Sequence, residues 1–160
     1  MPASFVRSSR LFPGVPYAYA AAAPGTGVIF TAGACPLDVQ GCVVTPGDVA
    51  GQMRQAVSNL QVTLEECGAK LSDVLKTTVY VCSARRVDLV AAWNVVAAAF
   101  GDHDAPSTLL GVAALGSEGQ LVEIEAVAYV APANAGSIRF DEPGLARKVD
   151  EVLAEGFGQE

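Results

Sequence analysis

The chain has 160 residues and a formal net charge of −7, from 17 Asp and Glu residues against ten Lys and Arg residues. A chain of this length is expected to form one domain with its own core. No apolar run approaches the ~20 residues that cross a bilayer, and the Lys and Arg residues do not gather into a patch that could follow a phosphate backbone. We therefore expect neither a membrane segment nor a nucleic-acid partner.

The N-terminal segment and the cysteines indicate the compartment. Basic residues near the start are not followed by the apolar core of a secretory signal, so we expect the protein in the cytoplasm. The four cysteines, Cys35, Cys42, Cys67 and Cys82, include no C-x-x-C pair, and the chain has one histidine. This set does not supply a tetrahedral zinc site. The prediction is four reduced thiols with packing roles, no metal and no cofactor.

The first half of the chain is predicted to contain a strand and a helix. Residues 28–33 (VIFTAG) form the first clear strand, after an extended segment at 15–23 and before a turn-rich stretch. Asp48 is a candidate N-cap, and Gly68 ends the helix that follows. Between them, apolar residues recur every three or four positions: Val49, Met53, Val57, Leu60, Leu64 and Cys67. This spacing predicts one buried face on a helix of about five turns.

The second half is predicted to contain a strand, a helix and a hairpin. A strand at 74–82 precedes a helix that ends at Gly101. The apolar stripe of this helix is Leu89, Trp93, Val96 and Phe100. Strands at 108–114 and 121–130 follow, joined as a hairpin by LGSEGQ. This order favours an α+β arrangement in which both helices cover one face of a single sheet.

Alternation along two of the strands predicts which side chains face the helices. In 121–130 these are Val122, Ile124, Ala126, Ala128 and Val130, which leaves Glu123 and Glu125 on the second face. In 74–82 they are Leu75, Thr77, Val79 and Val81, which leaves Lys76, Thr78 and Tyr80 on the second face. A large, partly apolar sheet face is rarely left in water by a monomer, so we expect self-association through it.

Residues 132–160 are predicted to lie outside the domain, which then covers 1–131. They begin as a linker of small residues and contain a predicted helix at about 143–157.

Five segments of the sequence together resemble a known family. They are PYAYA, VIFTAGACPLD, QMRQAVSNLQVTLEECGAKLSDVLKTTVYV, AAWNVVAAAFG and QLVEIEAVA. Over roughly residues 13–130 the chain resembles the Rid family, the reactive intermediate deaminases also called YjgF-like proteins. The resemblance implies a chorismate-mutase-like fold with a mixed sheet, and a homotrimer whose sheets line a central barrel. It also implies small-molecule sites in the clefts between subunits.

The resemblance further implies hydrolysis of reactive enamines and imines. In the family an arginine before the penultimate strand holds the substrate carboxylate, and a glutamate on the last strand helps to position water. A guanidinium contacts an anion through two prongs, and a carboxylate near water can take or give a proton. Carried over by position, Tyr17 matches the pocket tyrosine and Gly33 the turn glycine. Asn94 matches the asparagine of the second helix, and Glu123 the glutamate.

The arginine does not carry over. The family pattern P-A-R-[ST] stands here as Ala105, Pro106, Ser107 and Thr108, so Ser107 occupies the arginine's place. The glutamine that usually follows the turn glycine is Ala34, and the loop before Glu123 is one residue longer than usual. These departures all touch the pocket, and the loss of the carboxylate anchor weakens the expectation of the classical reaction.

Two functions remain open from the sequence. The first is a hydrolase of the enamine or imine deaminase type, with Glu123 as the catalytic residue and a small metabolite held at Tyr17, Gly33, Asn94, Ser107 and Thr108. The alternative is a non-catalytic trimer that binds a metabolite or a partner protein in the same clefts. Plainer roles also fit: Glu123 can pair with a charge such as Lys76, and His103 can be a solvated loop residue.

Overall fold

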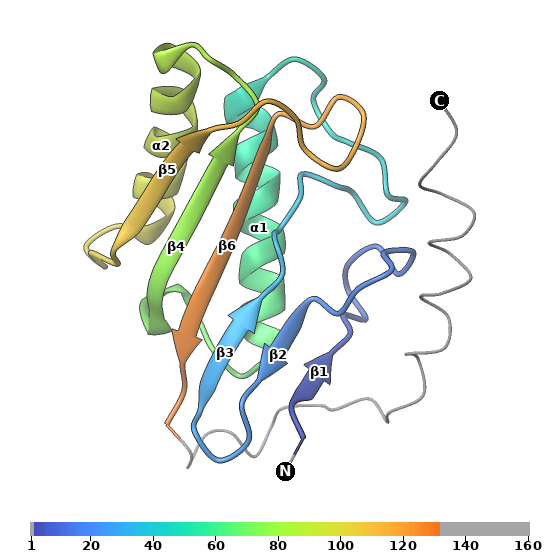
Figure 1. The fold of residues 1–160 in the computed structure, drawn as a ribbon, viewed down its shortest axis with the longest axis vertical. Coiled ribbons are helices and arrows are strands. Elements are labelled where there is room, and N and C mark those ends of the chain that lie inside the picture. Colours follow the sequence, from blue (N-terminus) through green and yellow to red (C-terminus); the bar gives the residue numbers. More distant parts are fainter. Residues whose placement is uncertain (1, 132–160) are drawn as a thin grey trace.

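The protein forms a six-stranded sheet covered on one face by two helices (Figure 1). The structure, a computed structural model, describes residues 2–131. Its strand order is β1-β2-β3-β6-β4-β5, and all pairs are antiparallel except β4 with β5. The expected α+β arrangement is therefore confirmed. The predicted helix at about 143–157 lies outside the described residues.

Helix α1, Val49–Glu66, begins and ends where the sequence predicts. The Asp48 side chain accepts a hydrogen bond of 2.9 Å from the Gly51 N–H, which satisfies one of the free donors of the first turn. Gly68 follows the helix with a φ of 73°, a conformation that favours glycine. The predicted apolar face lies against the sheet, where Met53 and Leu60 are fully buried.

Strand β6, Val122–Tyr129, runs through the centre of the sheet. It pairs antiparallel with β3, Val28–Thr31, on one side and with β4, Val74–Val81, on the other. Its helix-facing residues are buried as predicted: Val122, Ile124, Ala126, Ala128 and Val130. Glu123 is therefore held at the middle of the sheet on the face opposite the helices.

The predicted hairpin between the last two strands is wrong. Strand β5, Ser107–Gly111, pairs with β4 in parallel, with Thr77 opposite Ser107, and it forms the edge of the sheet. Helix α2, Arg86–Phe100, provides the crossover that a parallel pair requires. The LGSEGQ loop then crosses the end of β4. Strand β6 follows it and pairs with β4 on the side opposite β5, at the centre of the sheet.

Two short strands extend the other side of the sheet. Strand β2, Ala20–Ala22, covers only part of the extended segment predicted at 15–23. Strand β1, Ser4–Val6, was not predicted, because three residues without clear alternation give no strand signal. It forms by pairing with β2.

The predicted inward position of Leu75 is wrong. Leu75 is 52% exposed, whereas Val74 before it is buried. The register of β4 against β6 shifts between Val74 and Lys76, so Leu75 is the extra residue of a β-bulge and turns outward. Beyond the bulge Thr77 is buried, as predicted.

The burial predicted for Trp93 is also wrong, because its side chain remains 37% exposed. The buried residues of α2 are Ala92 and Val96, with Leu89 and Phe100 packed beside them. The face that touches the sheet therefore includes Ala92, which lies about 100° around the helix axis from Trp93. Trp93 stands at the margin of this contact.

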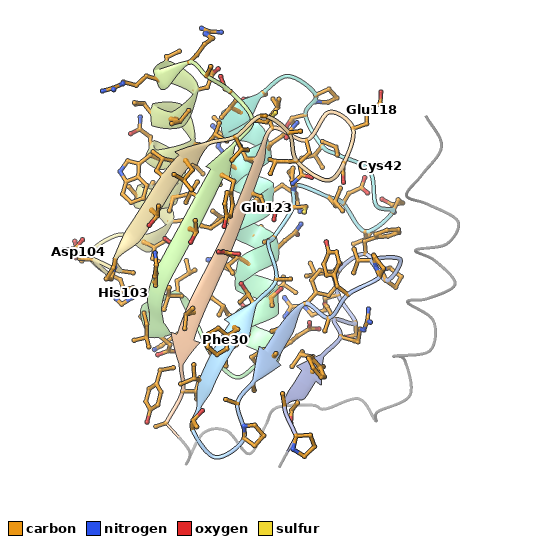
Figure 2. The ribbon with its side chains drawn as sticks, viewed as in Figure 1. Phe30, Cys42, His103, Asp104, Glu118 and Glu123 are labelled. Carbon is orange, nitrogen blue, oxygen red and sulfur yellow. The ribbon has the colours of Figure 1, made fainter. Side chains whose placement is uncertain are left out.

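The face opposite the helices has the mixed character that the sequence predicts. The strand registers place Phe5, Ala21, Phe30 and Val127 in one row across β1, β2, β3 and β6. Phe30 is 53% exposed and lies on this face below Glu123 (Figure 2). Beside this apolar row, the Tyr80 hydroxyl donates to Glu125 Oε1 at 3.0 Å.

Candidate functional site

Glu123 lies against the backbone of Gly33. After β3 the chain continues alongside β6, and Ala34 forms an isolated bridge with Ile124 through an N–H to O distance of 2.7 Å. This bridge places Gly33 next to the Glu123 side chain. A Cβ atom at Gly33 would overlap Glu123 Oε1, Cδ and Cγ, so a side chain at this position would displace the Glu123 carboxylate. The φ of Gly33 lies outside the left-handed region, so backbone strain plays no part.

One carboxylate oxygen of Glu123 is held by two neutral donors. Gln120 Nε2 donates to Glu123 Oε2 at 2.9 Å, and Cys35 Sγ donates to the same oxygen at 3.4 Å. Gln120 is buried and fixed at both ends of its amide: Nε2 also donates to the Val122 carbonyl, and Oε1 accepts from the Ser117 N–H, both at 3.0 Å. Among residues 2–131, no donor forms a hydrogen bond with Oε1.

Cys35 and Tyr17 adjoin the carboxylate in their neutral forms. Burial, and after it the charge of Glu123, raises the pKa of Cys35 to about 12. Burial, and after it the neighbouring Cys35, raises the pKa of Tyr17 well above its ordinary value. Near neutral pH both groups therefore keep their protons and can donate hydrogen bonds. A cavity of about 10 Å³ lined in part by Tyr17 and Cys35 is at the lower limit for one water molecule.

The loop that carries Tyr17 is fixed from two sides. Arg7 Nη1 donates to the carbonyl of Tyr17 at 2.6 Å and to that of Val15 at 3.1 Å. The Tyr19 hydroxyl donates to the Phe12 carbonyl at 2.6 Å. The rings of Tyr17 and Tyr19 meet edge to face at a centroid distance of 6.3 Å. Tyr17 is thus held beside Glu123 although it lies in a loop.

Ser107 and Thr108 lie apart from this group. The side chain of Ser107 points to the helix face, where its Oγ is 2.6 Å from Thr77 Oγ1. Thr108 lies on the same face as Glu123 and accepts from Lys76 Nζ at 3.0 Å, so Lys76 does not pair with Glu123. Strand β4 lies between β5 and β6, so their backbones are about 10 Å apart.

Asn94 lies on the other side of the sheet. It is exposed on α2 and lines a groove between the two helices together with Arg54. One chain therefore brings Tyr17, Gly33 and Glu123 together and leaves Asn94, Ser107 and Thr108 elsewhere. The functional roles of all six stay predictions.

The expectation that His103 is a solvated loop residue is wrong. Its Nε2 lies 2.7 Å from the Val74 carbonyl oxygen, and its ring stacks on Phe100 at a centroid distance of 6.2 Å. The imidazole is half-buried because it closes the end of the α2 layer. His103 and Asp104 lie in the loop before β5 (Figure 2). With Trp93 and Ser107 they line a hollow of about 240 Å³.

Sequence reasoning missed two residues of the site, Cys35 and Gln120. Cys35 was assigned a packing role, although it follows Gly33 by two residues. Gln120 lies three residues before Glu123, in the loop that leads into β6, and this proximity was a usable signal.

The described residues offer no metal-binding cluster and no membrane helix. Within residues 2–131, no three His, Cys, Asp or Glu side chains are grouped so that they could hold a metal ion. In the same range, neither helix has the length and apolar character needed to span a bilayer. All four cysteines are free thiols.

Comparison with known proteins gives one consistent result. Residues 9–130 match the family described as Endoribonuclease L-PSP. The RutC family protein PH0854 of Pyrococcus horikoshii is 33% identical over 111 residues, covering 69% of this chain and 86% of that protein. The 2-iminobutanoate/2-iminopropanoate deaminase of Escherichia coli K12 is 35% identical over 104 residues, covering 63% and 78%.

Solved structures agree in fold. An L-PSP endoribonuclease homologue from Entamoeba histolytica matches with a TM-score of 0.71 and 29% identity, over 81% of this chain and all of that one. The YjgF gene product of Escherichia coli matches with a TM-score of 0.66 and 30% identity, over 78% and 97%. All five segments that resemble the Rid family fall within the matched range. This chain therefore belongs to the Endoribonuclease L-PSP family, which is the Rid or YjgF-like family.

Proposed function

We propose that the protein hydrolyses a small imine or enamine, with Glu123 as the general base and general acid that accepts and returns the proton. The observation that carries the proposal is the Glu123 carboxylate itself, which is tethered at Oε2, while Oε1 lies against Gly33 and receives no hydrogen bond from residues 2–131. A carboxylate that can reach one water is suited to general base and then general acid chemistry. Membership of a family that includes an iminobutanoate deaminase supports this reaction class.

The reaction needs only water and proton transfer. The imine reacts as its protonated iminium form, and an enamine reaches this form when a proton adds to its carbon. Glu123 accepts a proton from a water molecule as the water oxygen adds to the iminium carbon, which gives a neutral carbinolamine. Glu123 then returns this proton to the nitrogen, and as the C–N bond breaks and ammonia leaves, Glu123 accepts the hydroxyl proton while the carbonyl forms and releases it to solvent. The neutral Tyr17 hydroxyl can donate a hydrogen bond to the substrate during these steps. No cofactor enters the balance.

We propose that the complete site lies between subunits of a cytoplasmic homotrimer. Within one chain the Glu123 group and the Ser107–Thr108 segment are separated by β4, so a small ligand cannot touch both. The exposed row with Phe5 and Phe30 and the free edge of β5 offer surfaces for a neighbouring copy. A second copy could bring its β5 edge to the Glu123 group of the first.

The charge available to a substrate carboxylate differs from that of the family pattern. Ser107 cannot replace an arginine, because its hydroxyl is neutral and is engaged by Thr77 at 2.6 Å. Lys76, at 3.0 Å from Thr108, supplies a positive charge at the same edge. An ammonium is a point charge without the two-pronged geometry of a guanidinium, so we expect weak hydrolysis of amino-acid-derived imines.

The test generates imines with an amino acid oxidase and lets semicarbazide compete with the protein for them. Hydrolysis by the protein lowers the yield of semicarbazone. We expect Glu123→Gln to lower the rate by about a hundredfold. Glu125→Gln is the matched control, since Glu125 lies on the same strand and face but pairs with Tyr80. Equal rates in the two variants, or no hydrolysis by the wild-type protein, would contradict the proposal.

A non-catalytic trimer that binds a small metabolite is the second candidate. The specific observation in its favour is the missing arginine at position 107, which leaves family geometry without the family's anion anchor. Pyruvate and 2-oxobutanoate are the probes, because they are the carbonyl compounds that iminopropanoate and iminobutanoate yield. A ligand that binds the folded state raises its melting temperature. A rise without imine hydrolysis would favour binding over catalysis.

A further inference from the structure

Cys35 is a thiol in direct contact with the proposed catalytic carboxylate, and a nucleophilic role is the first possibility to test against the geometry. A thiol attacks as its thiolate. Burial and the adjacent Glu123 charge raise the pKa of Cys35 to about 12, so thiolate is scarce near neutral pH. The groups that contact the Cys35 side chain are Glu123, Tyr17, Gln120 and the carbonyl of Gly33, and none of them is a cation. Cys35 is therefore a neutral donor in this site.

The two donors to Glu123 act on the same oxygen. The Cys35 thiol approaches Oε2 from the turn after β3, and the Gln120 amide approaches it from the loop before β6. The backbone of Gly33 lies against the other side of the carboxylate. A carboxylate held in this way has little rotational freedom, and its two oxygens are no longer equivalent.

We infer that Cys35 and Gln120 are positioning residues that hold Glu123 Oε2, so that Oε1 is the oxygen that exchanges protons with water and substrate. This inference rests on the proposed function. It assigns the acting atom and two residues that work through Glu123. We call the two donors, Cys35 and Gln120, the clamp on Glu123. The Gln120 amide is itself held by backbone groups, the carbonyl of Val122 and the N–H of Ser117.

A thiol and an amide also suit this task chemically. Both donate to the carboxylate without transferring a proton of their own near neutral pH. Among Cys35, Gln120 and Glu123, the carboxylate of Glu123 is therefore the group that accepts the catalytic proton. A lysine or arginine in the same place would instead form an ion pair with Glu123 and compete with the water for it.

The contact between Cys35 and Glu123 is tested first, by a measurement that does not depend on catalytic activity. Site-resolved alkylation by iodoacetamide at pH 8.5, followed by peptide mass spectrometry, reports each thiol of the full chain. Burial is the larger cause of the raised Cys35 pKa, and Glu123→Gln removes the charge that adds to it. Each unit by which that pKa falls raises the thiolate fraction about tenfold. We expect Cys35 to react several-fold faster in Glu123→Gln than in wild type and unchanged in Glu125→Gln.

Two other thiols serve as internal controls. Cys42 is exposed and its rate should stay constant in every variant, whereas the buried Cys67 reports loss of folding. If the alkylation rate of Cys35 is the same in Glu123→Gln as in wild type, and the rates of Cys42 and Cys67 are also unchanged, the inference is overturned. So would a Cys35 that reacts as fast as Cys42 in the wild-type protein, because that result would mean an ordinary exposed thiol.

The positioning role is tested by the imine assay. Cys35→Ala and Gln120→Leu remove one donor each, and we expect kcat to fall about three- to thirtyfold with little change in KM. Cys35→Ser keeps a hydroxyl donor and should recover part of the loss. If Cys35→Ala leaves kcat unchanged in an active protein, the inference fails and the proposed function stands. If the wild-type protein shows no hydrolysis, the proposed function fails and the catalytic use of Oε1 fails with it.

Discussion

Gly33→Ala tests the geometry on which the site depends. The three atoms nearest to a new Cβ all belong to Glu123, and the Cβ would overlap Oε1. The carboxylate must then move and lose the hydrogen bonds from Gln120 and Cys35. Hydrogen bonds to charged groups contribute about 1.5 to 3 kcal/mol, and the thiol is the weaker donor of the two. Because water can reach a displaced carboxylate, we expect a loss of about 1.5 to 3 kcal/mol in the free energy of unfolding.

A double-mutant cycle isolates this contact from other effects. In a Glu123→Ala background the overlapping atoms are gone, so Gly33→Ala should cost almost nothing and the coupling energy should nearly equal the whole single-mutant loss. Gly116→Ala is the matched control, because nothing lies within 4 Å of its Cβ position and its φ is ordinary. There we expect no change, or a gain of up to about 1 kcal/mol from the reduced entropy of the unfolded chain.

Urea unfolding followed by far-ultraviolet circular dichroism measures these free energies. All variants must be compared at one protein concentration, because the stability of an oligomer depends on it. Costs that simply add, with a coupling energy below about 0.5 kcal/mol, would show that Gly33 and Glu123 do not touch. The site as described would then be refuted.

Three further predictions follow from the same geometry. Light scattering after size exclusion should give the mass of three chains, and a single-chain mass at micromolar concentration would contradict the assembly. Ser107→Arg should raise the rate of imine hydrolysis about ten- to a hundredfold by restoring a charged anchor, and an unchanged rate would show that position 107 does not meet the substrate. Burial, with Glu66 adding to it, raises the pKa of Cys67 from 9.0 to about 12, so the folded state binds this proton more tightly than the unfolded chain does. The free energy of unfolding should therefore fall as the pH rises from about 9 towards 12, and the slope should be smaller in Cys67→Ala.

Local signals predicted the elements that local physics determines. Asp48, the three- to four-residue spacing after it and Gly68 place α1 without tertiary information, because the cap, the buried face and the terminal glycine all lie within one segment. The same holds for β6, where strict alternation marks the buried side chains. In these elements propensity and packing agree.

The wrong predictions concern residues whose orientation or secondary structure depends on a distant segment of the chain. Leu75 was placed inward because alternation was continued through Val74 and Lys76, and a bulge is invisible until the partner strand is known. Trp93 was placed inward because it shares the apolar spacing of Leu89, Val96 and Phe100, but packing on the sheet sets the rotation of α2 and buries Ala92 instead. Strand β1 exists through its pairing with β2.

The candidate site depends on distant segments in the same way. The positions of Tyr17, Gly33 and Glu123 came from the family resemblance, and no spacing in the sequence would have joined them. The Cys35–Glu123 hydrogen bond connects residues 88 positions apart, and it exists because the bridge between Ala34 and Ile124 brings the turn after β3 to β6. A contact of that range becomes visible once the sheet is assembled.

Assembly and chemistry are linked in this proposal because one chain provides only part of a site. Glu123 and Tyr17 lie together, while Thr108 lies on β5, beyond β4, and the ammonium of Lys76 reaches Thr108 from β4. In one chain a carboxylate bound at Thr108 and a water activated by Glu123 would sit on β5 and β6, whose backbones are about 10 Å apart. The clamp on Glu123 forms within one chain, so it should persist in dissociated subunits, whereas hydrolysis should vanish with them. Alkylation of Cys35 and turnover of imine, measured across the same dilution series, would separate these two dependences.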